Sequence, residues 1–232
     1  MKLRPLYVAA GLVLAVMLAV SIWAWPQIPD DALIPTHWNA AGEADGFSSK
    51  PFGLFGLPAV CAGVTLLLAV LPRVEPRRQN LEKSARAYIA IGMATLLLMA
   101  AIHVAAVLST VGVDVNVSSV SVVTLSVLLC VMGVALRRVR SSWLFGIRTP
   151  WTLTSERSWK RTHEVGSVVF LVVGIASLLV ALAADPSVAL WAQLGAIGVG
   201  VVGLVVYSYL VWRNDPHRTE PPPTSDETLD VG

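Results

Sequence analysis

The sequence predicts an all-α integral membrane protein, a bundle of about six transmembrane helices with the N- and C-termini in the cytoplasm. Composition is the first reason, because 55% of the residues are hydrophobic and only 14% are charged, whereas about 25% of a typical soluble chain is charged. The second reason is the length of the apolar runs. The third is the one-sided distribution of lysine and arginine.

A helix needs about 20 mainly apolar residues to cross the hydrocarbon layer. Six runs reach this length, at about 6–25, 52–71, 87–110, 118–136, 164–184 and 188–212. Transmembrane β-barrel strands are short and alternate in hydrophobicity, which these runs do not. The first run is longer than the apolar part of a secretory signal peptide, so we expect it to remain as a helix.

The orientation follows from the positive-inside rule, which counts lysine and arginine near helix ends. With the N-terminus inside, 16 of the 17 Lys and Arg residues are cytoplasmic, and only Lys50 is outside. Anionic lipid headgroups account for basic residues at such positions, so no direct nucleic-acid contact is predicted. Residues 1–212 are expected to form the membrane domain, and the proline-containing segment 213–232 a disordered cytoplasmic tail.

Residues 26–51 form the first connection that is too long to be a simple turn, and we call it the outer loop. Its prolines disfavour helix and its glycines permit tight turns, so a compact cap is expected. Three roles remain open: a structural cap, a ligand or peptide contact, and a metal site. No spacing matches a known metal motif, so neither a metal nor a cofactor is predicted. The candidate ligand-facing residues are His37, Asn39, Gly42, Glu43, Asp45 and Lys50.

Residues 137–163 form the second long connection, the inner loop. Gly146 permits a turn, and Thr154 is expected to cap a helix that starts near Ser155 and continues into the fifth span. Tryptophans suit the membrane–water boundary, so the loop either anchors the bundle or docks a cytosolic partner or a headgroup. The candidate contact residues are Arg148, Thr149, Trp151, Thr152, Glu156, Trp159 and His163.

The two loops carry recognisable motifs. IPTHWNAAGEADGFSSKP (residues 34–51) resembles the outer loop of a widespread membrane domain of unknown function. GIRTPWTLTSERSWKRTHEVG (residues 146–166) resembles the signature of the SdpI family, which is named for an immunity protein against a secreted bacterial cannibalism toxin. The family's outer motif falls on His37, Gly42, Asp45 and Lys50. Its inner motif falls on Gly146, Arg148, Thr149, Pro150, Trp151, Thr152, Glu156, Trp159 and His163.

This resemblance implies a multi-pass protein of the bacterial cytoplasmic membrane that protects its producer against a secreted antimicrobial peptide. It also implies partners: the lipid bilayer, an extracellular peptide toxin, and a cytosolic repressor-type protein to which the toxin's presence is relayed. The alternative function is a small-solute or lipid transporter, or a membrane enzyme acting on a lipid-linked substrate. Such proteins place ionisable groups within the membrane, and the clear interior candidate here is His103. A neutral histidine bonded to a neighbouring helix is the expected role of this residue, and catalysis is not favoured.

Overall fold

A computed structural model of the chain describes residues 3–39 and 42–218. Within these ranges, six helices are long and apolar enough to cross a membrane, as predicted. They are α1 (Arg4–Ala24), α2 (Lys50–Val74), α4 (Ala85–Thr110), α5 (Val117–Leu136), α7 (Glu156–Ala183) and α8 (Pro186–Arg213). Two short helices, α3 (Arg78–Lys83) and α6 (Pro150–Thr154), lie in the connections.

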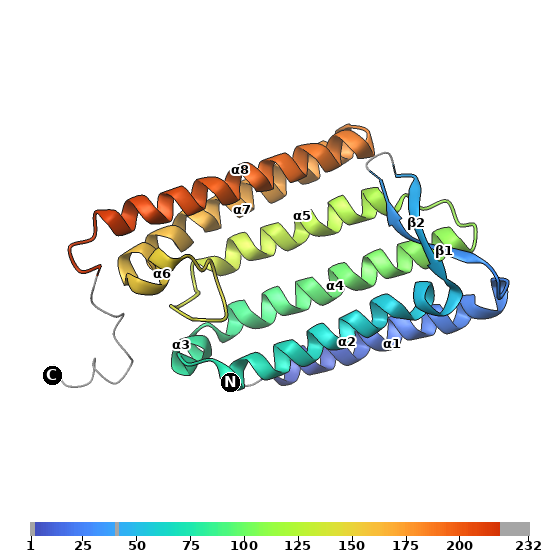
Figure 1. Cartoon of the computed structure of the whole chain (residues 1–232), viewed down its shortest axis with the longest axis horizontal. Coiled ribbons are helices and arrows are strands. Elements are labelled where there is room, and N and C mark those ends of the chain that lie inside the picture. The colour runs from blue at the N-terminus through green and yellow to red at the C-terminus, as the bar shows by residue number, and fades with distance from the viewer. Residues whose placement is uncertain (1–2, 40–41, 219–232) are drawn as a thin grey trace.

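The long helices run side by side, with α1 and α2 along one edge, α7 and α8 along the other, and α4 and α5 between them (Figure 1). The first half packs α1 and α2 against α4, the second half packs α7 against α5 and α8, and α4 against α5 joins the halves. The start of α1 and the end of α8 lie at one end of the bundle (Figure 1). The outer loop lies at the opposite end.

Small residues allow α5 and α7 to approach closely. A Cβ added to Gly133 would lie 2.7 Å from the backbone nitrogen of Leu171, and one added to Gly174 would lie 2.8 Å from the carbonyl oxygen of Ser126. Ser167 also donates a hydrogen bond of 2.5 Å to the carbonyl oxygen of Gly133. Lipid gives helices no hydrophobic reason to associate, so close packing and interhelical hydrogen bonds hold this pair together.

The outer loop corrects the purely α-helical expectation. After the short 3-10 helix η1 (Trp25–Gln27), an antiparallel pair of strands, β1 (Leu33–Trp38) and β2 (Ala44–Ser49), forms a hairpin (Figure 1). The strands are short, and their register is irregular around His37. A Cβ on Gly46 would lie 2.8 Å from the Cβ of His37, so glycine permits this close strand contact. The hairpin could not be read from hydropathy, because its pattern of alternation is weak.

The cap of the fifth transmembrane helix also differs by one residue from the expectation. Ser155, and not Thr154, is the N-cap of α7, and its Oγ accepts a hydrogen bond of 2.9 Å from the Ser158 amide. Thr154 instead ends α6 and donates its hydroxyl to the Pro150 carbonyl at 2.9 Å. Ser155 has an extended backbone, which separates α6 from α7. The N-cap of α7 therefore falls on Ser155.

The predicted tail starts at residue 213, which is the last residue of α8. Residues 214–218 follow α8 within the described structure, and Asp215 is buried there. The hydroxyl of Ser155 donates to Asp215 Oδ2 at 2.5 Å, which ties the end of α8 to the start of α7. Burial would raise the pKa of Asp215, but hydrogen bonds from Ser155 and the His217 amide outweigh it and lower that pKa. The expected disorder of residues 219–232 lies outside the described residues.

Candidate functional site

The hairpin presents a polar pair to solvent. His37 Nδ1 lies 2.5 Å from Asp45 Oδ1, and these side chains are 73% and 46% exposed. The turn between the strands is closed by Asn39, whose Oδ1 accepts from the Glu43 amide at 3.0 Å and whose Nδ2 donates to Glu43 Oε2 at 3.1 Å. An exposed pair of this kind contributes little to stability, and both side chains are accessible to solvent at this end of the bundle.

Lys50 differs from its expected position in the ligand-facing surface, because it is buried. Its Nζ donates to the Ile28 carbonyl at 2.7 Å and to Asp30 Oδ1 at 2.8 Å, and it lies 4.4 Å from the centroid of the Trp25 ring. The hydrogen bond from Lys50 and its charge hold the pKa of Asp30 below the usual range. Because Lys50 is the first residue of α2, its side chain turns back to the preceding segment. It anchors the outer loop.

Gly42 places the hairpin turn against the start of α5. Its φ of +84° belongs to the left-handed region, and a Cβ there would lie 3.3 Å from the side-chain nitrogen of Asn116. Asn116 caps α5 by accepting from the Ser119 amide at 2.9 Å. The turn therefore sits beside a capped helix end.

The inner loop is organised around two buried rings, those of Trp159 and His163. The rings stack with centroids 4.1 Å apart. His163 Nδ1 donates to the Trp159 carbonyl at 2.8 Å, and Nε2 accepts from the Ile147 amide at 3.0 Å. This pattern requires a neutral imidazole with its proton on Nδ1. Trp159 Nε1 donates to the Val139 carbonyl at 3.0 Å, so the two rings hold the inner loop at Val139 and at Ile147.

Gly146 makes room for these rings. Its φ is +116°, and an added Cβ would lie 2.7 Å from His163 Nε2 and 2.9 Å from the Trp159 ring. Such distances are shorter than van der Waals contact. The backbone of the inner loop can therefore cross the ring stack only at a glycine.

Thr149 and Thr152 form a capping box at the start of α6. The Thr149 amide donates to Thr152 Oγ1 at 2.8 Å, and the Thr152 amide donates to Thr149 Oγ1 at 3.2 Å. Both residues are buried, and Thr149 Oγ1 also lies 3.1 Å from Ser208 Oγ of α8. These two threonines therefore hold α6 against the bundle, and their side chains face no solvent.

Three of the predicted inner-loop residues remain accessible. Arg148 is exposed and donates to the Trp143 carbonyl at 3.0 Å, and Glu156 is exposed in the first turn of α7. Trp151 is half-buried, with its ring 5.2 Å from the Tyr209 ring. Thus the structure divides the predicted contact set into an accessible group and a buried group, the latter being Thr149, Thr152, Trp159 and His163.

A buried carboxylate that was not predicted from the sequence, Glu75, binds the inner loop. Glu75 follows α2, is buried, and accepts from Ser142 Oγ at 2.7 Å and from the amides of Trp143 and Leu144 at 3.0 and 2.8 Å. The Arg77 amide donates to it at 2.9 Å. Burial would raise the pKa of Glu75, but these hydrogen bonds outweigh it and lower that pKa. We call this cluster the Glu75 clamp.

Arg77 completes the clamp. Its Nη2 donates to the Leu153 carbonyl at 3.2 Å, and its Nη1 donates to Ser141 Oγ. Burial lowers the pKa of Arg77, and the charges of Glu156 and Glu75 oppose that change. The sequence held a signal for this cluster, since Glu75 is the one carboxylate in the basic segment 72–78.

His103 lies inside the bundle where α1, α2 and α4 meet. Its Nε2 is 3.0 Å from Ser21 Oγ and 3.2 Å from the Met17 carbonyl oxygen. Ser21 Oγ donates in turn to the Leu54 carbonyl at 2.6 Å. A polar network of this kind links three helices in a medium without water. In residues 3–39 and 42–218, no three His, Cys, Asp or Glu side chains are grouped so that they could hold a metal ion.

These features define a multi-pass membrane protein with an exposed hairpin at one end and a buried, motif-rich loop at the other. Residues 12–62 match the sequence model of a domain of unknown function, DUF1648, and residues 138–210 match that of the SdpI/YfhL protein family. The chain is 25% identical to Immunity protein SdpI of Bacillus subtilis (strain 168) over 154 residues, which cover 66% of this chain and 70% of that relative. No solved structure matches.

The predicted resemblance to the SdpI family is therefore confirmed, and the chain is a multi-pass protein of a bacterial membrane. The first matched region contains the outer hairpin, and the second begins in the inner loop and extends along α8.

Proposed function

We propose that the protein is a membrane immunity protein that protects its producer against a secreted antimicrobial peptide, which it meets at the outer hairpin. The observation that carries this proposal is the resemblance to an immunity protein across 66% of the chain. The geometry supports it, because the His37–Asp45 pair is exposed on the paired strands β1 and β2. A rigid element that carries exposed polar groups can bind a ligand at low entropic cost.

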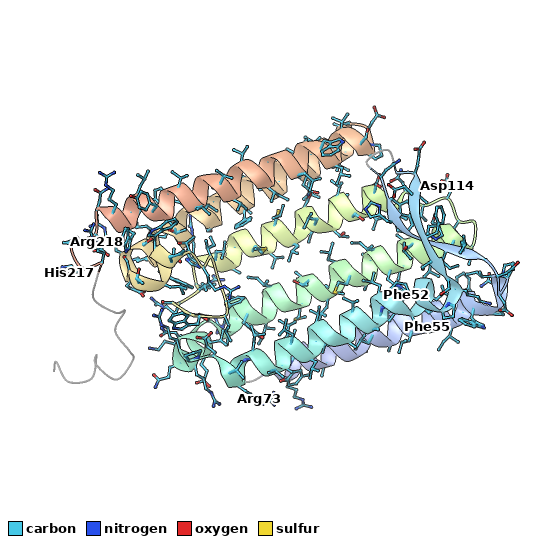
Figure 2. The ribbon with its side chains drawn as sticks, in the orientation of Figure 1. Phe52, Phe55, Arg73, Asp114, His217 and Arg218 are labelled. Atoms are coloured by element: carbon cyan, nitrogen blue, oxygen red, sulfur yellow. The ribbon has the colours of Figure 1, made fainter. Side chains whose placement is uncertain are left out.

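The proposed orientation places the hairpin outside and both termini in the cytoplasm. Among the described residues, Lys50 is the one Lys or Arg at the hairpin end. Asp114 lies at that end as well, whereas Arg73 and Arg218 lie at the other, which we call the basic end (Figure 2).

In a background without Cys61 and Cys130, an impermeant thiol reagent should label Thr36→Cys in intact cells and Thr154→Cys only after permeabilisation. Labelling of Thr154→Cys in intact cells, with Thr36→Cys labelled only after permeabilisation, would show that the proposed orientation is wrong.

A relay to a cytosolic partner, which the family resemblance implies, would use the accessible residues of the inner loop. Trp159 and His163 are buried, so a repressor-type partner would contact Arg148, Trp151 and Glu156. A peptide at the hairpin is separated from them by the length of the bundle (Figure 1). The coupling therefore requires a change in helix packing, for which the α4–α5 junction between the halves is the available element.

The test of the proposal expresses the protein in a sensitive bacterium and measures survival against the secreted peptide of the producer strain. His37→Ala and Asp45→Ala should abolish protection while the amount of protein in the membrane stays unchanged. Asp114→Ala is the matched control, because Asp114 is an exposed acidic residue at the same end but outside the hairpin (Figure 2). Equal survival with all three variants, or loss of protection that follows loss of protein, would overturn the proposal.

A further inference from the structure

A cavity of 720 Å³ lies at the basic end of the bundle, where α3, α4, α5 and α7 meet. Its volume falls within the range of about 300–1,000 Å³ that is usual for small-molecule sites. Trp159 and His163 form part of its wall. Because it lies at helix ends, it lies at the depth of the lipid headgroups.

The wall of this cavity is strongly basic. Six basic side chains and three acidic ones line it. Two of the carboxylates have basic partners on their own helices, Glu82 with Arg78 at 3.4 Å and Glu164 with Arg161 at 3.5 Å. The charges of Arg140 and Lys160 act on the third carboxylate, Glu156, but among the described residues no salt bridge joins an acidic side chain to any of the six basic ones. These are Lys83, Arg86, Arg137, Arg138, Arg140 and Lys160.

An apolar groove of 290 Å³ continues from the cavity between α4 and α5. Ala87, Ala90, Cys130 and Val134 line it, and Val134 is 57% exposed on the lipid-facing surface. Arg86 and Arg138 line both the cavity and the groove. The two arginines therefore stand where a charged group would join an apolar one.

We propose that this composite site binds one anionic phospholipid, with its phosphate between Arg86 and Arg138, its headgroup in the cavity and an acyl chain in the groove. Arginine offers a planar pair of donors that suits phosphate. A free phosphate would use only the cavity, whereas the continuous apolar groove selects a ligand with a hydrocarbon chain. Because Trp159 and His163 form the cavity wall, the bound lipid stabilises the inner loop.

The experiment uses the full chain in detergent and titrates phosphatidylglycerol or phosphatidylcholine, with native mass spectrometry and the thermal midpoint as readouts. Phosphatidylglycerol should bind preferentially and raise the midpoint. Arg86→Gln combined with Arg138→Gln should weaken this binding about thirtyfold, given the usual contribution of a basic residue near anionic lipid. Arg213→Gln, an exposed arginine outside the cavity, should leave the binding unchanged.

A second pair of variants tests the groove. Ala90→Trp fills the groove and should remove lipid binding, while Leu97→Trp, at a lipid-exposed position elsewhere on α4, should not. Equal midpoints of all variants without lipid confirm that each is folded, and a variant that fails this check is replaced by Arg86→Lys or Ala90→Leu. Equal binding of the two lipids, or stabilisation by inorganic phosphate that matches that by phosphatidylglycerol, would overturn the proposal. So would wild-type binding by Ala90→Trp.

Discussion

The outer and inner loops both carry family motifs with one histidine each, yet they use it in opposite ways. The His37 side chain is 73% exposed and contacts one exposed carboxylate. His163 is only 2% exposed, stacks on a tryptophan and uses both ring nitrogens within the inner loop. A residue of a family motif can therefore either stabilise the fold of its loop or remain accessible to a ligand. The exposed fraction of its side chain distinguishes these two roles.

The physical cause of the difference is where the backbone groups find partners. In the hairpin, the two strands supply each other's hydrogen bonds, so the side chains are left for other tasks. The inner loop is irregular between helix ends, and its amides and carbonyls need side-chain partners. Glu75, Arg77, Thr152 and His163 supply them. Substitutions should therefore destabilise the inner loop more than the outer one.

The largest effect is expected for Gly146→Ala. The left-handed backbone costs about 1–2 kcal/mol with a Cβ, and the clash with the ring stack adds about 1–3 kcal/mol. Gly42→Ala is the matched control, since Gly42 also has positive φ but faces only a movable amide at 3.3 Å. Thermal unfolding in detergent should show a much larger loss for Gly146→Ala. Equal losses would mean that the two loops are equally tolerant.

Glu75→Gln should have the next largest effect, about 2–3 kcal/mol, because hydrogen bonds to a buried charge are lost or weakened. The folded-state pKa of Glu75 lies below its ordinary value of 4.5. Its stabilisation is thus complete above that value and is lost as the pH falls through the lowered folded-state pKa.

Melting curves between neutral and acidic pH test this prediction. The wild type should lose stability on acidification, and Glu75→Gln should lose less. Glu43→Gln, which alters an exposed carboxylate of the hairpin turn, should behave as the wild type. If the wild type and Glu75→Gln lost the same stability on acidification, the ionised Glu75 carboxylate would not be what stabilises the inner loop.

Lys50→Met should cost about 1–3 kcal/mol, because the buried Ile28 carbonyl loses its donor. The effect should stay local and loosen the segment before α2 without disturbing the inner loop. Hydrogen exchange should therefore rise in residues 26–38 and remain unchanged in 141–155. Increased exchange in both segments would contradict a local anchor.

The sequence was sufficient for the six spans, because each is a long apolar run bounded by charges or turns. It also placed the start of the fifth helix near Ser155. It could not show which motif residues are buried, since Trp159 and His163 read equally well as surface or packing residues. Nor could it connect Glu75 to Ser142, because their contact joins positions far apart in the chain. Such pairing depends on how the helices assemble.

The smallest effect on stability is expected for His37→Ala, below about 1 kcal/mol, because a solvent-exposed polar pair contributes little to stability. The hairpin's strand pairing and the Lys50 anchor do not depend on the His37 ring. If the same variant abolishes protection, function and stability separate at this position, as a ligand-contacting residue requires. The free energy of unfolding should therefore be measured beside survival for His37→Ala and Asp45→Ala. A stability loss as large as that of Glu75→Gln would place His37 among the packing residues and leave the hairpin without its proposed contact.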